Sequence, residues 1–157
     1  MPFRRRLRDE SGAAIVEFAL VLPFLVLVFV LMLDFGRAFN YWINTTHLAA
    51  EGARLAAVDR VPASSSSLQD YIRGRAGTGE LANGGSDWIA APLEVCVNPD
   101  GDEVGDPIEV TVTTTYHFLP IGSLSIPGVN NIGDMDIQGK ATMRREVAAD
   151  NVSAGCG

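Results

Sequence analysis

A single carboxyl group lies inside the most apolar stretch of the chain. Glu17 is the only charged residue between Ala13 and Leu33, and an isolated charge at the centre of a bilayer costs roughly 2.5–3.5 kcal/mol. The cost falls if Glu17 lies one turn inside the interface. It also falls if Glu17 meets a cation, because a cut after Gly12 would create a new α-amine on Ala13 of the same helix or of a neighbouring subunit. Glu17 is therefore the first candidate functional residue.

Acidic side chains gathered in one short turn are the second candidate. Oxygen ligands close together in a loop suit Ca²⁺, and the candidate ligands are Asp100, Asp102 and Asp106, with Glu103 beside them. The stretch lacks the downstream bidentate acid of an EF-hand, and an acidic, solvated hairpin turn has the same composition. We therefore expect no metal and no cofactor, and this turn is a weak candidate at most.

Nucleophilic and zinc chemistry are not indicated. His47 and His117 are the only histidines, and both a hydrolytic triad and a zinc site need more partners than these two offer. The chain has no glycine-rich phosphate-binding loop. We expect no catalytic residues and predict that the chain is not an enzyme.

The two cysteines, Cys96 and Cys156, both follow the apolar stretch. If that part of the chain lies in an oxidising compartment, a disulfide between them would close a long loop. In the chain-entropy model such a crosslink stabilises the fold by ~4 kcal/mol. Two free thiols are the alternative.

An apolar helix positions the first of these groups. Ala13 to Leu33 is long enough to cross the hydrocarbon core of a bilayer at ~1.5 Å per residue. The run is longer than the core of a cleavable secretory signal and no small-residue cleavage site follows it, which favours an anchor. Basic residues that precede the run place the N-terminus in the cytoplasm and the part after Asp34 outside; they are Arg4, Arg5, Arg6 and Arg8.

The helix is expected to continue beyond the membrane to about Val58. Residues 34–60 repeat small and apolar side chains at helical spacing, among them Phe35, Phe39, Trp42, Ile43, Thr46, Ala49, Ala50, Ala53 and Ala56. Pro23 removes a backbone hydrogen bond and predicts a kink in the span. Tyr41 and Trp42 are predicted to anchor the helix at the outer interface.

Small residues recur on this part of the helix, at Ala49, Gly52, Ala53 and Ala56. Such a stripe admits close approach of another element. That element is either the chain's own outer domain or a neighbouring helix in an assembly.

The part after the helix predicts a small mixed domain with three antiparallel strands. A short helix, Leu68–Arg75, is expected after a cap at Ser67, and a flexible loop at Gly77–Ser86. Alternating residues predict strands near 93–98, 108–118 and 137–144, joined by a turn at 99–107 and an apolar-tipped loop at 119–134. The fold class is therefore α+β, a long N-terminal transmembrane and stalk helix packed on a small antiparallel sheet. Four segments are expected: a leader (1–12), a span (13–33), a helix continuation (34–60) and an outer domain (61–157).

The outer part is acidic. From Asp34 onward the chain carries 16 acidic and 8 basic residues, a net charge of −8. An acidic exterior disfavours nucleic acid and anionic lipid surfaces as partners.

The N-terminal motifs resemble a known family. A basic leader that ends in Gly12, with Ala13 after it, Glu17 five places after the cut and Phe18 next, is similar to the prepilin-peptidase signature of type IV filaments. The series GAAIVEFALVLP, DFGR and AAEGARLAA, with a late ATMRRE, resembles the TadE-like minor pilins, or pseudopilins, of the Tad/Flp tight-adherence pilus.

This resemblance implies a pilin-like fold and a role in assembling an adhesion pilus. It implies a prepilin peptidase that cuts after Gly12, and assembly that depends on Glu17 and Phe18. Other Tad pilins and an inner-membrane platform are the implied partners, and the cytoplasmic membrane, pilus or cell surface the implied location. The alternative is an uncleaved single-pass envelope protein whose outer domain binds a ligand or surface.

Topology can be tested directly. Because the leader is basic and the residues after Asp34 are not, a reporter fused after residue 60 should be active outside the cytoplasm. Paired alkaline phosphatase and green fluorescent protein fusions measure this, since each is active on one side of the membrane. A fluorescent, phosphatase-negative result would contradict the predicted orientation.

Overall fold

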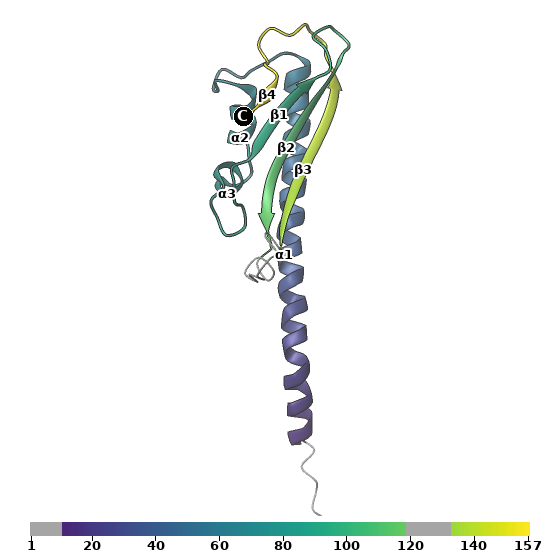
Figure 1. The fold of residues 1–157 in the computed structure, drawn as a ribbon, viewed down its shortest axis with the longest axis vertical. Coiled ribbons are helices and arrows are strands. Elements are labelled where there is room, and N and C mark those ends of the chain that lie inside the picture. Colours follow the sequence, from purple (N-terminus) through teal and green to yellow (C-terminus); the bar gives the residue numbers. More distant parts are fainter. Residues whose placement is uncertain (1–10, 119–132) are drawn as a thin grey trace, which may run out of the picture.

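A computed structural model of the protein describes residues 11–118 and 133–157, with the backbone alone at Ser11. The predicted basic leader and most of the predicted loop at 119–134 lie outside the described residues. One helix, α1 (Ser11–Ala57), runs through the whole length of the described molecule, and a small sheet with two short helices lies along its C-terminal half (Figure 1). The predicted α+β class is confirmed.

Helix α1 has two halves in different surroundings. The apolar N-terminal half is exposed along its entire length, whereas one side of the C-terminal half is buried under the sheet. It is the one helix among the described residues that is long and apolar enough to cross a membrane. The backbone stays helical through Pro23, so the bend expected there remains a prediction.

The end of α1 is built around Asp59. The Arg60 N–H donates to the Leu55 carbonyl at 3.0 Å and the Asp59 N–H to the Ala56 carbonyl at 3.1 Å, the pair of bonds of a Schellman motif. Asp59 occupies the left-handed position of this motif, with φ 50°, where glycine is usual. The Asp59 side chain must therefore make interactions that a glycine at this position could not make.

That contribution is a set of hydrogen bonds to the C-terminal segment. The Asp59 carboxylate accepts from the backbone N–H groups of Asp150, Asn151 and Val152, each at 2.8 Å. Burial opposes the charged carboxylate, but these bonds outweigh it and lower the pKa of Asp59. Asp59 thus fastens the end of the chain to the end of α1.

The sheet is antiparallel throughout. Its strands are β1 (Glu94–Pro99), β2 (Pro107–His117), β3 (Asp134–Arg144) and β4 (Gly155–Cys156), in the order β3-β2-β1-β4. The first three correspond to the predicted strands. Alternate residues face the core, as the period of two required; they include Val95, Val97, Ile108, Val110 and Val112, all at most 1% exposed.

Strand β4 was not predicted. Sequence analysis left Cys156 in the C-terminal tail, whereas the structure pairs it directly with Cys96 on β1. The two sulfurs form a disulfide that spans 60 residues of sequence. Two residues are too few for a strand pattern, so the pairing could not be read from the local sequence.

Two short helices cover the β1 side of the sheet. Helix α2 (Leu68–Gly74) confirms the prediction, and the Ser67 hydroxyl caps it by accepting from the Asp70 N–H at 3.1 Å. The prediction of a flexible loop at Gly77–Ser86 is wrong, because this stretch contains helix α3 (Gly79–Asn83). Thr78 caps α3, and its Leu81 is fully buried and packs the segment against the head.

Small residues let α1 approach the sheet and α2. A Cβ on Gly139 of β3 would lie 2.3 Å from the Thr45 backbone, and one on Gly52 would lie 2.5 Å from Ile72 Cδ1. Ala49, Ala53 and Ala56 are all fully buried. Of the two readings of the small-residue stripe, packing under the chain's own domain is the one that the structure confirms.

This close approach predicts a large effect at Gly139. In Gly139→Ala the new methyl group meets the backbone of α1, which cannot rotate away, so we expect a loss of about 1–3 kcal/mol of stability. Gly36→Ala is the matched control, because nothing lies within 4 Å of a Cβ there and alanine favours the helix by up to ~1 kcal/mol. Urea unfolding in detergent micelles measures both. Equal stabilities would contradict the packing described.

Candidate assembly site on the N-terminal helix

The residues predicted to act in processing and assembly lie in the first turns of α1. Gly12 and Ala13 are helical, and, apart from the adjoining helix backbone, no atom of the described residues lies within 4 Å of the position that a Cβ on Gly12 would take. Glu17 is exposed, and no described residue makes a hydrogen bond or ion pair to its carboxylate. Phe18 beside it is 59% exposed. This end of the helix presents an acid and an aromatic ring that the described chain does not cover.

A second polar group lies where α1 enters the head, and sequence analysis missed it. Asp34, the residue after the apolar stretch, is only 3% exposed. The hydroxyl of Tyr116 on β2 donates to its carboxylate and lies 3.2 Å from its backbone oxygen. A carboxylate that lipid would penalise is thus withdrawn into the head under an O–H donor.

Neighbouring side chains extend this contact. Tyr41 donates to Glu80 at 2.9 Å, and its ring centroid lies 5.6 Å from that of Tyr116. The Arg37 guanidinium lies over the ring of Trp88, 3.9 Å from its centroid. The whole group is termed the neck cluster: Asp34, Arg37, Tyr41, Glu80, Trp88 and Tyr116. Tyr41 is buried in it, so the prediction that Tyr41 anchors the helix at the membrane interface is wrong.

The hydroxyls of the neck cluster are held in their protonated form. Burial raises the pKa of Tyr41 to about 12, and the hydrogen bond and charge of Glu80 act in the same direction. Burial, and after it Asp34, likewise raises the pKa of Tyr116. Both hydroxyls therefore remain donors across the neutral range. Two donors facing two carboxylates make this cluster a joint between helix and head.

The acidic turn is organised by its own chain. The Asp106 carboxylate accepts from the Glu103 N–H at 3.0 Å, and Asp102 lies 3.9 Å from Nη2 of the buried Arg145. Within the described residues, the one set of three acidic or sulfur groups close enough to share an ion is Glu94, Cys96 and Cys156, and its sulfurs form the disulfide. The expectation of no metal at Asp100, Asp102 and Asp106 stays a prediction.

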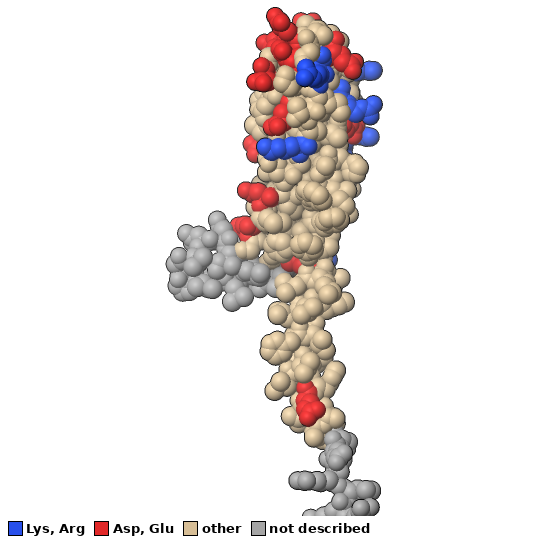
Figure 2. Space-filling model, turned by 90° about the vertical axis from the view of Figure 1, so that its right-hand side faces the viewer, with Lys and Arg blue, Asp and Glu red and all other residues tan. Residues whose placement is uncertain are grey.

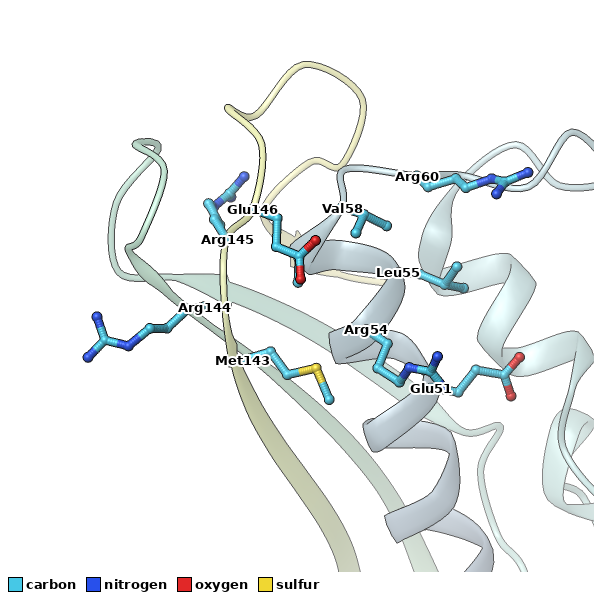
Figure 3. Close-up of a pocket in the computed structure, with 10 residues that line it drawn as sticks. Glu51, Arg54, Leu55, Val58, Arg60, Met143, Arg144, Arg145 and Glu146 are labelled. Carbon is cyan, nitrogen blue, oxygen red and sulfur yellow. The ribbon is translucent and has the colours of Figure 1, made fainter.

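A groove of about 810 Å³ lies beside the end of α1. Met143 and Glu146 point toward the last turns of the helix, while Arg144 points away (Figure 3). Its charged lining residues are two glutamates and four arginines, and none of the lining residues that the structure describes is Ser, Thr, Cys or His. The groove thus offers no nucleophile, and the expectation that the chain is not an enzyme stays a prediction.

The described geometry can be set beside known proteins. The model of the family described as TadE-like protein matches residues 12–54. The N-terminal helix is TadE-like. The match begins at Gly12 and covers Glu17, Asp34 and most of the buried side of α1, a little over a quarter of the chain. No curated protein and no solved structure matches the chain. The sheet, with Tyr116, lies outside the TadE-like segment.

We expect the hydrogen bond between Tyr116 and Asp34 in the neck cluster to hold the head on the TadE-like helix. Tyr116→Phe removes one donor from a buried carboxylate and should destabilise the head by about 1–3 kcal/mol. Tyr71→Phe is the control, because the Tyr71 hydroxyl reaches Glu51 at 3.4 Å near the surface, and surface changes of this kind stay within about 0.5 kcal/mol. Urea unfolding in micelles compares the two. A Tyr116→Phe effect no larger than the control would contradict the role given to Asp34.

Proposed function

We propose that the chain is a minor pilin, or pseudopilin, of a Tad/Flp-type adhesion pilus, cut after Gly12 by a prepilin peptidase and active in pilus assembly. The observation that carries this proposal is the uncovered carboxylate of Glu17 near the start of a membrane-spanning helix that matches the TadE-like family from Gly12 onward. The family match and the apolar helix together support the broader conclusion that the chain is a membrane-anchored protein related to the Tad pilus.

Gly12 supports the proposal because the described fold does not need a glycine there. A Cβ at this position would meet nothing within 4 Å. Glycine inside a helix is less favourable than alanine by about 0.5–1 kcal/mol. An enzyme that binds an extended segment at the membrane face would account for the missing side chain, since glycine adopts extended and turn conformations without obstruction.

Glu17 supports it through charge. A carboxylate in the span is costly unless it is paired or lies near an interface, and the described chain supplies no cation to it. Cleavage after Gly12 would create an α-amine on Ala13, one turn earlier on the same helix, or on an incoming subunit. The proposed cut would thus supply the positive charge that the Glu17 carboxylate lacks.

The packing of α1 supports a role in an assembly. The small-residue stripe is buried within the chain's own head, so the surface available to other pilins includes the exposed apolar half of α1 from Gly12 to Leu33. Phe18 and the apolar side chains after it are exposed there. The proposed partners are the peptidase, other Tad pilins and the inner-membrane platform.

Two substitutions separate processing from assembly. Gly12→Val should leave the leader attached, because the side chain obstructs the peptidase. Glu17→Ala should still be cut but should assemble poorly, because the new amine lacks its counter-charge. Gly36→Val is the matched control, a second glycine of α1 with open space around it, and it should be processed normally. Intact-mass analysis of membrane-extracted protein and pilus yield measure the outcomes; the processed form begins AAIVEF.

A full-length wild-type chain in cells that contain the peptidase would contradict the proposal. That result, with little effect from either substitution, is what an uncleaved anchored binding protein predicts.

A further inference from the structure

Three aromatic rings on α1 point away from the head core just beyond the apolar stretch. Phe35 is 65% exposed, and Phe39 and Trp42 are each 49% exposed, with the latter two ring centroids 5.5 Å apart. Met135, at the start of β3, is 42% exposed and lines the same groove as these rings. These four residues are termed the apolar neck face. Sequence analysis treated its aromatic rings as part of one apolar stripe with the small residues, but the side of α1 that the head covers is a different one.

The apolar neck face continues the surface of the span without interruption. Phe35 also lines a second groove, on the span side, with Val28, Leu31, Met32 and Phe118. Helical spacing puts residues 28, 35, 39 and 42 on one side of α1. On the face drawn in Figure 2, charged side chains gather on the distal part of the head, while the lower head and the helix below it are largely tan.

The other side of the same helical turns is polar. Arg37 and Asn40 line a separate groove with Thr78, and the Arg37 guanidinium covers Trp88. Asn44 follows one turn later and donates to the Asn40 carbonyl at 3.3 Å. The lower head therefore has an apolar side and a polar side, separated by α1.

The acids near Met135 belong to the opposite face of β3. The Asp136 carboxylate accepts from the Thr115 hydroxyl at 2.8 Å, and Asp134 pairs with His117. Alternate residues of a strand point to opposite faces, so these two carboxylates point away from the face that bears Met135. The four residues of the apolar neck face carry no charge, although Asp136 and Gln138 also line the groove beside them.

The length of the uncharged surface indicates what covers this face. Between Glu17 and Asp34 lie the sixteen residues Phe18–Leu33, which span ~24 Å as a helix. The hydrocarbon core of a bilayer is ~30 Å thick, so this stretch is short by about 6 Å. On the apolar side the uncharged surface runs on to Trp42, a length of ~37 Å, which covers the core and one interfacial layer.

We infer that the apolar neck face lies in the headgroup layer of the leaflet next to the head, with α1 leaning toward this side. The lean lowers Phe35, Phe39 and Trp42 into the interface, where aromatic rings are favoured, and lifts Arg37 on the opposite side toward water. Transmembrane helices lean by about 20° on average, up to about 40°. The same position brings Glu17 nearer to the other hydrocarbon boundary, where a carboxylate is less costly.

A bilayer fits this face better than a second copy does. The face is continuous with the span that lipid already surrounds. Of the two sides of α1 at the lower head, only this one is uncharged. The inference rests on the membrane anchor and not on cleavage or pilus assembly.

The two tryptophans make the test direct. The full chain is placed in phosphatidylcholine vesicles whose acyl chains carry bromine either near the headgroup or near the chain end. Trp88→Phe leaves Trp42 as the only tryptophan. Trp42→Phe leaves Trp88, on the polar side, as the matched control. We expect headgroup-proximal bromine to remove roughly half of the Trp42 emission, with a smaller loss from deep bromine and little quenching by acrylamide. Trp88 should not respond to either lipid.

Two outcomes would overturn the inference. Trp42 quenched by acrylamide and by neither lipid would mean that the face lies in water. Trp42 protected from both, with protection lost as protein is diluted in lipid, would mean that a second copy covers it.

A charge placed on each side of α1 tests the cause. In the Trp88→Phe background, Phe39→Glu should reduce the headgroup-proximal quenching of Trp42 at least twofold, because it replaces an aromatic ring favoured at the interface with a charged group that favours water. Asn40→Glu, exposed on the polar side, should leave it unchanged. Near-ultraviolet circular dichroism verifies that both variants fold. Equal effects from the two substitutions would contradict the assignment of the apolar side as the membrane contact.

Discussion

One helix serves two solvents in this molecule, and the rest of the structure depends on that constraint. The N-terminal half of α1 must satisfy lipid, the C-terminal half must form the spine of a soluble head, and no linker separates them. The change of environment therefore falls on a few residues at the neck. Asp34 marks this change from lipid to the head, because its carboxylate faces Tyr116 on the sheet and not the hydrocarbon. A flexible hinge would have removed the problem, but it would also have let the head move freely over the span.

The head solves its side of the constraint with small residues. Ala49, Ala53 and Ala56, with Gly52 and Gly139, bring α1 so close to the sheet and to α2 that backbone and side chains touch directly. Such packing gains contact area from short side chains and loses little side-chain conformational entropy, since alanine and glycine have no rotamers to fix. Phe35, Phe39 and Trp42, which precede these residues on α1, are left exposed. A helix that used Phe and Trp to bind its own head would have none to present to the membrane.

Much of the fold could be predicted because its signals are local. The two-residue period of Val95 and Val97, the Ser67 cap and the unbroken helical stretch of α1 each depend on a few neighbouring residues. The rest depends on partners distant in sequence. Strand β4 exists because Cys156 meets Cys96 across 60 residues, and the neck cluster because Tyr116 on β2 reaches Asp34. Helical spacing also placed Phe35, Phe39 and Trp42 in one stripe with the small residues, whereas the head packs on the alanines and leaves these three rings exposed. The residues proposed for processing, Gly12 and Ala13, could be named because their motif is contiguous, and the fold itself gives no reason for them.

The acids near the two ends of the helix differ in whether the chain itself compensates them. Both buried carboxylates of the described head, Asp34 and Asp59, accept hydrogen bonds from the chain itself, one from a tyrosine hydroxyl and the other from three backbone N–H groups. The chain is thus well able to compensate an acid when folding alone requires it. Glu17 has no such arrangement among the described residues, although its position in an apolar helix is the costlier one. An acid retained where folding gives it no partner is most simply explained by a partner that arrives after folding. In the proposed function, a cut after Gly12 would supply that partner as the new α-amine of Ala13, on the same helix or on a neighbour.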